Sequence, residues 1–501
     1  MQTLSFDSLG RRTGVLLHVT SLPGPRGIGE LGAAARAFLD WLARTGATVW
    51  QFLPLSPPSG PHCPYISWAS TLGNPAVVDL EALRDWGLLS DADLRAPGFP
   101  EDFVDFDAVL GWKLPLLQKA ASVLLSSASH PRAGVFARFQ KESDYLQEPA
   151  LFHALRRRYN APWWQWPQPL RDRVPDALKV SRIELGAEID EVVCLQFFFE
   201  SQWADLRAYA RQRGIYLFGD VPIYVDLDSC DVWMNREQFY LDSQGSPTVV
   251  AGVPPDYFSE KGQLWSNPLY RWDRMAEDDY AWWRARLGRV LCHADFVRID
   301  HFRGLSSYWE IPAWASDART GVFRKGPGRA FFEVMRRHFG PLPLIAEDLG
   351  MIDEEVISLR QWAELPGMKV LQFAFGGDAT NPHLPHNHSR RNVVYLGTHD
   401  NDTARGYLEK LDPRTHEHLR CYLSLGEGDP VWNLIRVSLG SVCDLAVITM
   451  QDLLGLGSEA RMNNPATVLG NWRFRIREQD LDPSCADRLR DLNGLYGRLT
   501  R

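Results

Sequence analysis

Eight short apolar segments, most of them followed by a stretch with helical periodicity, constrain the fold of this chain more than any other feature. The segments are 14–19, 47–55, 216–225, 295–300, 343–348, 369–375, 393–400 and 445–452. Near-continuous apolar runs are typical of parallel strands buried on both faces. Eight alternating units predict a (β/α)8 TIM barrel, an α/β fold, in one domain spanning 1–501. A doubly wound open sheet is the alternative, although no GxGxxG motif follows any of these segments.

Helices are predicted between these segments at 33–45, 191–213, 329–339 and 353–364. Two connections are too long for a simple crossover. Residues 56–190 follow the second strand and are predicted to form a mostly helical insertion. Residues 226–276 follow the third strand and are predicted to form a loop-rich insertion.

Charge and cysteine usage exclude several classes of protein. Lys and Arg number 54 and Asp and Glu 62, a net charge of -8 that disfavours nucleic acid or an anionic membrane as the main partner. The seven scattered cysteines form no CxxC pair, which is typical of reduced thiols in a cytoplasmic protein. No HExxH spacing indicates a metal site, and we expect no metal and no cofactor. The apolar run near the N-terminus is too short for a signal peptide, and no run approaches a membrane span.

One strand ends in a paired charge. In the segment 295–300, Arg298 and Asp300 are two residues apart and therefore project from the same face of the strand. A nearby guanidinium favours the ionised carboxylate, and such a carboxylate can attack an electrophilic carbon. A purely structural salt bridge from Asp300 to Arg298 or Arg303 is the alternative interpretation.

Carboxylates recur at the ends of four predicted strands, where the active residues of TIM barrels lie. They are Asp220, Asp300, Glu347 and Asp400. Such a cluster fits the hydrolysis or transfer of a glycosidic bond, which two carboxyl groups flank. Asp300 is the candidate nucleophile. Glu347, after an apolar run and beside Asp348, is the candidate general acid, and Asp400 could stabilise positive charge at the sugar carbon or bind ring hydroxyls.

Each of these carboxylates also has a structural interpretation. Asp220 could orient a neighbouring loop, and Glu347 or Asp348 could stabilise the start of the following helix. The segment after Asp400 contains Asp402 and Thr403, which are common helix caps.

Eight motifs in order carry a resemblance that runs almost end to end. They are TSLPGPRGIGELG, GDVPIYV, AGVPPDYFSEKGQLWSNPLY, VRIDHFRG, IAEDLG, PGMKVLQFAF, LGTHDND and QDLLGLGSEARMNNP. With these motifs the chain resembles the 4-alpha-glucanotransferases, also called amylomaltases or disproportionating enzymes, of glycoside hydrolase family 77. The resemblance implies a retaining enzyme on a TIM barrel with inserted subdomains. It would transfer alpha-1,4-glucan segments to the 4-hydroxyl of an acceptor glucan or glucose, without a cofactor or metal.

The resemblance also implies roles for single residues. Asp300 would be the nucleophile, Glu347 the acid/base and Asp400 a transition-state stabiliser. The sugar before the cleaved bond would be lined by Tyr65, Asp220, Arg298 and His399. The second insertion would carry a substrate lid over the acceptor side, with Asp256, Tyr257, Phe258 and Trp265. Ordinary core packing is the alternative for these aromatic residues.

The chain departs from the family pattern at five positions. Cys63 replaces the usual Ser, Ser266 the usual Gly and Tyr407 the usual Trp. Asp226 and Cys230 stand where the family usually has small residues. None of them is one of the three carboxylates, so they leave the fine substrate preference open and not the reaction. An alpha-amylase-type retaining hydrolase and a non-catalytic carbohydrate-binding barrel are the rival functions. The three candidate carboxylates disfavour the second.

Overall fold

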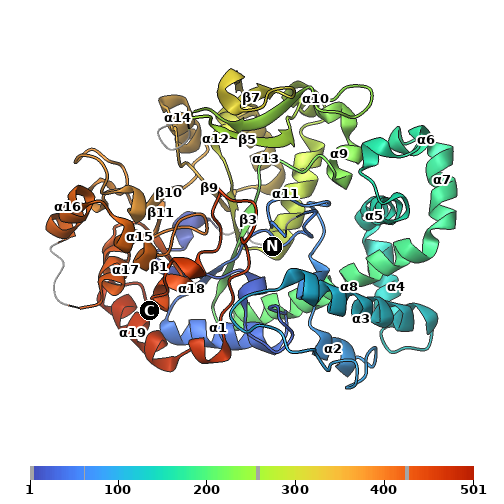
Figure 1. Ribbon diagram of the computed structural model, residues 1–501, viewed down its shortest axis with the longest axis horizontal. Helices are drawn as coiled ribbons and strands as arrows, with labels where there is room; N and C mark the ends of the chain where they lie inside the picture. The colour runs from blue at the N-terminus through green and yellow to red at the C-terminus, as the bar shows by residue number, and fades with distance from the viewer. Residues whose placement is uncertain (1–4, 61, 256–259, 424–427, 501) are drawn as a thin grey trace.

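The computed structural model describes residues 5–60, 62–255, 260–423 and 428–500. Its centre is a sheet of eight parallel strands in the order β10-β11-β12-β1-β2-β3-β6-β9 (Figure 1). The strands are β1 (Arg12–Leu16), β2 (Val49–Gln51), β3 (Tyr216–Val221), β6 (Phe296–Ile299), β9 (Leu344–Ala346), β10 (Gly367–Val370), β11 (Asn392–Tyr395) and β12 (Leu445–Thr449). Each overlaps one predicted segment, and the predicted barrel is confirmed.

The two end strands of this order, β9 and β10, also meet. The main-chain N–H of Ala346 donates to the carbonyl of Pro366 over 2.9 Å, which brings the sheet close to a closed barrel. Inside the barrel, the hydroxyl of Tyr395 on β11 donates to Oε1 of Gln51 on β2 over 2.9 Å. Because β11 and β2 are not neighbours in the sheet, this buried bond crosses the barrel interior.

Helices surround the barrel, and apolar periodicity explains their orientation. In α1 (Ala33–Thr45), the side chains of Ala35, Phe38, Leu39 and Leu42 are buried, and the helix ends before Gly46, whose φ of 73° favours glycine. The connection from β10 to β11, described throughout, contains only 3-10 turns. Besides α1, the helices around the barrel are α8 (Gly186–Gln212), α11 (Ala281–His293), α13 (Gly328–Phe339), α14 (Glu354–Trp362), α15 (Ala404–Lys410), α16 (Pro413–Leu423), α17 (Pro430–Gly440), α18 (Met450–Leu453) and α19 (Pro483–Leu495).

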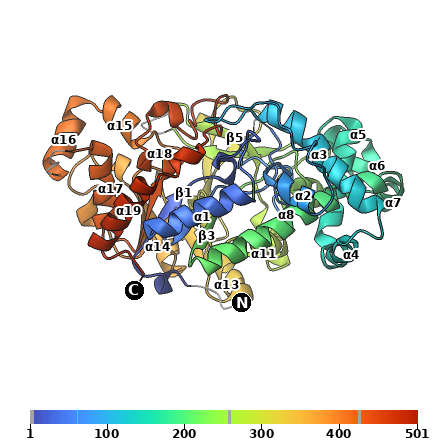
Figure 2. The ribbon, with the colours of Figure 1, turned by 90° about the horizontal axis from the view of Figure 1, so that it is seen from below.

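The long connection after β2 forms a helical lobe beside the barrel, on the right in Figure 1 and Figure 2. It contains α2 (Leu80–Asp85), α3 (Phe106–Ser126), α4 (Ala133–Glu142), α5 (Gln147–Tyr159), α6 (Gln168–Arg171) and α7 (Pro175–Glu184). The lobe contacts the barrel through α8, against which α3 and α5 pack.

Helix α3 is the one helix among the described residues that is long and apolar enough to cross a membrane, by length and composition alone. The expectation that no run approaches a membrane span is therefore wrong for this helix. Inside the fold, α3 packs against α8, and its Lys113 is fully buried in an ion pair with Glu30. These contacts place one face of α3 against the rest of the fold.

A second, antiparallel sheet in the order β5-β4-β7-β8 lies outside the barrel, at the top of Figure 1. Its strands are β4 (Val249–Val253), β5 (Gln263–Pro268), β7 (Ser307–Pro312) and β8 (Val322–Lys325). The short helices α9 (Cys230–Met234), α10 (Trp272–Glu277) and α12 (Arg303–Ser306) adjoin these connections. Two of the strands come from 226–276 and two from the connection after β6, which joins both segments into one layer.

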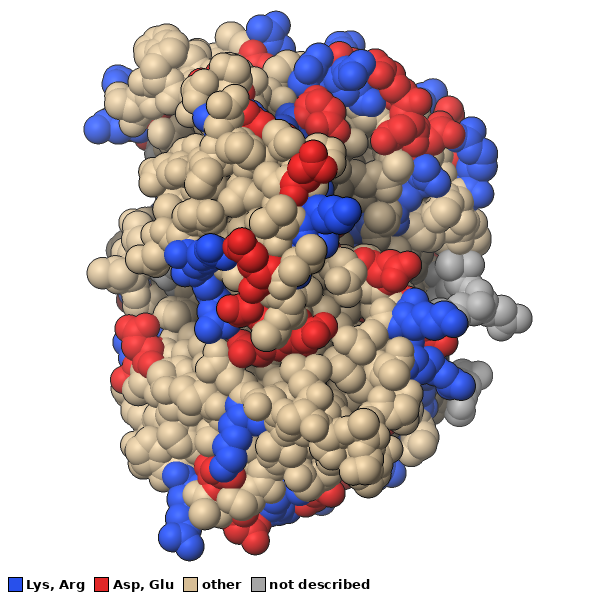
Figure 3. Space-filling view, turned by 90° about the vertical axis from the view of Figure 1, so that its right-hand side faces the viewer, with Lys and Arg blue, Asp and Glu red and all other residues tan. Residues whose placement is uncertain are grey.

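The outer face of the helical lobe carries both signs of charge. Figure 3 shows Lys and Arg interspersed with Asp and Glu over this face. Arg157 pairs with Glu191 and Arg158 with Glu184, at 2.9 Å and 2.7 Å. This face therefore lacks the one-signed surface that binds a polyanion.

Candidate active site

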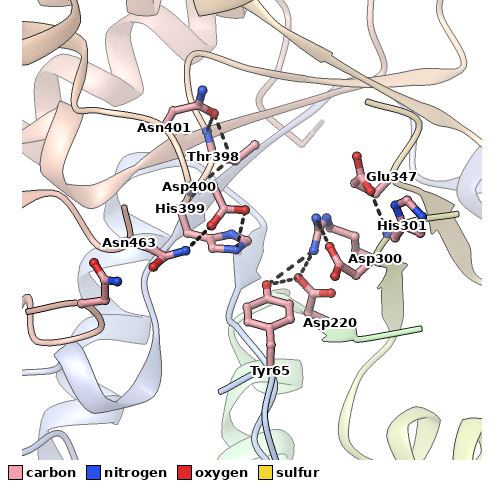
Figure 4. Close-up of polar contacts among 12 residues, drawn as sticks. Tyr65, Asp220, Asp300, His301, Glu347, Thr398, His399, Asp400, Asn401 and Asn463 are labelled. Carbon is pink, nitrogen blue, oxygen red and sulfur yellow. Dashed lines mark hydrogen bonds and ion pairs between the residues drawn. The ribbon is translucent and has the colours of Figure 1, made fainter. Parts of the chain in front are cut away.

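The predicted carboxylates meet at the carboxyl edge of the barrel (Figure 4). Asp220 lies on β3, Asp300 directly after β6 and Glu347 directly after β9, and these three strands are neighbours in the sheet. Asp400 lies in the loop between β11 and α15. Burial raises the pKa of the Tyr65 hydroxyl, and the charges of Asp220, Asp300 and Asp400 raise it further. The charges of three of the four acidic groups thus act on one phenol, which contacts Asp220 directly.

Arg298 connects two of these carboxylates. Its Nη1 donates to Oδ2 of Asp220 over 2.6 Å and its Nη2 to Oδ1 of Asp300 over 2.5 Å, so the predicted pair is present. The hydroxyl of Tyr65 also donates to Oδ2 of Asp220, over 2.9 Å. Burial opposes the charge of Arg298, but Asp220 and Asp300 outweigh it and raise the pKa of the guanidinium.

Asp220 and Asp300 differ in exposure. The side chain of Asp220 is fully buried, whereas 31% of the Asp300 side chain is exposed. Burial raises the pKa of Asp220 to about 7, against the opposing charge of Arg298. Asp300 is therefore the carboxylate that a ligand in the barrel mouth can reach, and Arg298 orients it.

Glu347 is held by two main-chain donors. The N–H of His301 donates to its Oε2 over 2.7 Å, and the N–H of Leu349 donates to its Oε1 over 2.9 Å. The residue keeps some solvent contact, yet it lies deep among protein atoms, and this burial raises its pKa to about 8. Asp300 raises the pKa further, and Arg298 opposes both effects. A carboxyl group with this pKa carries a proton at neutral pH, as a general acid must.

Asp400 faces the other carboxylates from the opposite side of the mouth (Figure 4). Nδ2 of Asn463 donates to its Oδ1 over 2.6 Å, and Nε2 of His399 lies 3.3 Å from its Oδ2. Burial lowers the pKa of His399, which keeps the ring neutral. The His399 ring stacks on Tyr65, with centroids 5.2 Å apart and planes 13° apart. Tyr65, His399 and Asp400 thus form one wall of the mouth.

The acceptor side is described in part. Asp256, Tyr257 and Phe258 lie outside the described residues. Trp265 on β5 lies against His301, with ring centroids 4.8 Å apart, and its Nε1 donates to Oε1 of Gln263 over 3.0 Å. His301 therefore contacts both residues: its ring lies against Trp265, and its main-chain N–H donates to the candidate acid Glu347.

Sequence reasoning missed two groups in this site. Asn463 lies within one of the quoted motifs, but it gave no charge or spacing signal that would tie it to Asp400. The main-chain N–H of His301 leaves no trace in the sequence, because every residue except proline has one. The backbone of His301 has a φ of 49°, and a positive φ outside glycine often accompanies a functional site.

The comparisons with known proteins agree with each other. The family model for 4-alpha-glucanotransferases matches residues 17–481. The 4-alpha-glucanotransferase of Thermus thermophilus is 44% identical over 98% of this chain and 100% of its own length. The chloroplastic/amyloplastic 4-alpha-glucanotransferase of Arabidopsis thaliana is 45% identical over 98% of this chain and 86% of its own length.

The chain belongs to the 4-alpha-glucanotransferase family. A solved structure of amylomaltase from Streptococcus agalactiae in complex with acarbose covers 98% of this chain and 100% of its own, with a TM-score of 0.94 and 36% identity. The amylomaltase from Corynebacterium glutamicum, at 20% identity and a TM-score of 0.75, shares the fold. The resemblance drawn from the motifs is confirmed: this is an enzyme of the 4-alpha-glucanotransferase type that acts on alpha-glucans.

Two of the departures from the 4-alpha-glucanotransferase pattern have a visible structural consequence. Burial raises the pKa of the Cys63 thiol to about 12, so that it stays protonated and offers a ligand only a weak contact. Ser266 has a φ of 65°, a left-handed conformation that favours glycine. The structure gives no reason for the replacements at Cys230 and Tyr407. Among the residues that the structure describes, no cluster of three His, Cys, Asp or Glu side chains is placed to hold a metal ion.

Proposed function

We propose that this 4-alpha-glucanotransferase works by a retaining double displacement in which Asp300 is the nucleophile, Glu347 the acid/base and Asp400 the transition-state stabiliser. One observation carries the proposal. Arg298 pairs with Asp300, whereas burial raises the pKa of neighbouring Glu347 to about 8. One carboxyl group is thus paired with a cation while the other keeps its proton, as the first step requires.

In the first step, an oxygen of Asp300 bonds to the anomeric carbon of an alpha-1,4-glucan. The bond from that carbon to the glycosidic oxygen breaks, and Glu347 gives its proton to this oxygen as the chain on the acceptor side leaves. Positive charge develops at the sugar carbon, and Asp400, held by Asn463 and His399, faces it. The product is a glycosyl ester in which the donor segment stays covalently bound to Asp300.

In the second step, Glu347 is ionised and acts as the base. It takes the proton from the 4-hydroxyl of a second glucan or of glucose, whose oxygen then bonds to the anomeric carbon and releases Asp300. The two displacements together retain the alpha configuration. The two main-chain donors at Glu347 support this step, because hydrogen bonds from His301 and Leu349 stabilise the carboxylate form.

The donor sugar would contact Tyr65, Asp220, Arg298 and His399, and the acceptor would contact Trp265. The roles of Asp256, Tyr257 and Phe258 in a substrate lid remain a proposal from the family resemblance. We further propose that 56–190 and 226–276 are insertions in one catalytic domain. The second insertion would exclude water from the glycosyl ester, so that a glucan rather than water resolves it.

Maltotriose is the test substrate. Transfer yields free glucose together with a ladder of longer maltooligosaccharides, whereas hydrolysis yields glucose and maltose without longer products. An inactive, carbohydrate-binding barrel yields neither. The Asp300→Asn variant is expected to lose the ladder, and unchanged product formation by this variant would remove the assignment of the nucleophile. Peptide mass spectrometry after reaction with a slow fluorinated glucosyl donor would locate the ester directly.

We also propose a cytoplasmic location. All seven cysteines are free thiols, as in a reducing compartment, although the related plant enzymes are named as chloroplastic.

A further inference from the structure

One pair of adjacent strands in the barrel, β9 and β10, has few hydrogen bonds between its members, and Glu347 lies next to it. Every other pair of neighbouring strands is joined by a regular parallel ladder, whereas β9 and β10 are the two ends of the hydrogen-bonded order. A single backbone bond, from Ala346 to Pro366, joins them at 2.9 Å. Glu347 follows Ala346 directly, so the candidate acid/base extends from the strand that has the weakest lateral support.

The side chain of Asp348 takes the place of the missing ladder. Its Oδ1 accepts the main-chain N–H of Met368 on β10 over 2.7 Å. Its Oδ2 lies 3.0 Å from Nε of Arg360, an ion pair in which the N–H does not point at the oxygen. Arg360 in turn donates from Nη1 to the carbonyl of Leu365 over 3.2 Å, in the turn that precedes β10.

The Asp348 carboxylate lies so close to the backbone at position 367 that only glycine leaves room for it. A Cβ added to Gly367 would lie 2.5 Å from Oδ2 and 2.9 Å from Cγ of Asp348, too close for any other residue. The side chain of Asp348 is 6% exposed and that of Arg360 is 15% exposed, so water replaces neither partner readily. A buried carboxylate with a main-chain donor and a guanidinium on opposite oxygens has a fixed orientation.

In the sequence, Asp348 lies between Glu347, the candidate acid/base, and Leu349, whose main-chain N–H binds it. This N–H donates to Oε1 of Glu347 over 2.9 Å. Any movement of Asp348 moves the Leu349 amide relative to the Glu347 carboxyl. The second donor, the N–H of His301, lies in the turn after β6 and does not follow this movement.

We propose that Asp348 is a positioning residue for the transfer reaction: by closing the barrel between β9 and β10 through Met368 and Arg360, it holds the Leu349 amide on Glu347. The inference rests on the proposed acid/base role of Glu347. A misplaced Leu349 amide stabilises the ionised form of Glu347 less, so the proton of the acid is lost at higher pH while the geometry for transfer worsens.

The experiment measures kcat and KM for maltotriose against pH, together with Tm, for Asp348→Ala, Asp348→Asn and Arg360→Gln. We expect Asp348→Ala to lower kcat by about tenfold to a hundredfold with little change in KM, the range typical of small displacements of catalytic groups. The alkaline limb of kcat should move to higher pH. Asp348→Asn retains a carbonyl acceptor for Met368 and should be milder. Arg360→Gln leaves the Asp348–Met368 bond intact. If Asp348→Ala does not fold, the pH dependence of kcat is measured on Arg360→Gln instead.

Asp295 provides a matched control at the opposite end of the barrel. It is also 6% exposed, accepts the N–H of Leu217 over 2.9 Å and pairs with Arg207 at 2.9 Å. Asp295→Asn should therefore lower Tm as Asp348→Asn does, without moving the alkaline limb. If the two variants change Tm and kcat alike and leave the limb in place, Asp348 is only structural and the proposal is overturned. If the alkaline limb of the unaltered enzyme survives in Glu347→Gln, the acid/base assignment fails instead.

Discussion

The main-chain N–H of His301, the residue after Asp300, donates to Oε2 of Glu347 over 2.7 Å. Two further backbone bonds join the same strand ends: Glu347 N to Ile299 O at 3.0 Å and Phe302 N to Glu347 O at 3.1 Å. The candidate nucleophile and the candidate acid/base are thus held together by the main chain itself. These bonds fix the two main-chain segments relative to each other, while the side chains of Arg298 and Asp348 complete the orientation of the two carboxyl groups, which a pair acting on one bond requires.

Replacement of Glu347 by Gln is expected to lower kcat by about 10²–10⁴-fold, the usual contribution of a general acid/base. In the unaltered enzyme, the rate should fall as pH rises through about 8, because the proton needed for the leaving group is lost there. Steady-state assays with maltotriose across pH 6 to 10 would check both points. A rate that stays level across this range would contradict the raised pKa.

The same pKa predicts a dependence of stability on pH. The folded protein keeps a proton on Glu347 that the unfolded chain releases near pH 4.5, so the folded state binds more protons between that pH and about 8. The contribution of this group is therefore full below the unfolded pKa and is lost as pH rises toward 8. Glu347→Gln removes the titration, and its Tm should fall less than that of the unaltered enzyme between pH 6 and 9. Equal slopes of Tm against pH would argue against the assignment.

Replacement of Arg298 by Met is expected to cost about 3–5 kcal/mol of stability, because it removes the cation that pairs with the buried carboxyl group of Asp220. The double variant with Asp220→Asn should be less destabilised than the sum of the two single variants, since Asn needs no cation. Urea unfolding of the four proteins measures this coupling. Additive free energies would mean that the 2.6 Å contact between Arg298 and Asp220 contributes nothing.

Replacement of Asn463 by Ala is expected to lower kcat about tenfold or more, because a hydrogen bond to a charged group contributes about 1.5–3 kcal/mol. This bond joins Asn463 to Asp400 at 2.6 Å. Asn392→Ala is the control, because Asn392 is buried at the start of β11, the strand that precedes Asp400, and donates to Oγ of Ser389. The control should lower Tm and keep kcat. A kcat that is equal in the two variants would separate Asn463 from the reaction.

The sequence predicted the barrel because buried parallel strands leave continuous apolar runs. The run 369–375 overlaps β10, but the strand is 367–370 and a 3-10 turn follows at 371–373, since hydrophobicity does not mark where extended backbone ends. The second sheet lacked this signal. Every residue of β8 is exposed, so 322–325 carries no alternation of apolar and polar side chains.

The candidate site was predicted as far as it consists of charged side chains at strand ends. Asp220, Asp300 and Glu347 come together because parallel strands share a carboxyl edge. Asn463 could not be paired with Asp400 from sequence, because the two are joined only by the folded loop after β12. The alternative pairing of Asp300 with Arg303 is wrong: Arg303 pairs with Asp353 at 2.8 Å.

Replacement of Ser266 by Gly is expected to raise the free energy of unfolding by about 0.5 kcal/mol, because relief of a left-handed conformation outweighs the entropy that glycine adds to the unfolded chain. Ser266 is exposed on β5, has a φ of 65° and lies where the pairing with β4 shifts register. Ser243→Gly is the matched control: Ser243 is equally exposed but has no positive φ, so its replacement should lower stability. Urea or thermal unfolding distinguishes the two signs. Loss of stability in both variants would mean that the backbone at Ser266 is not strained, and the replacement of the family's usual glycine would then have no energetic cost here.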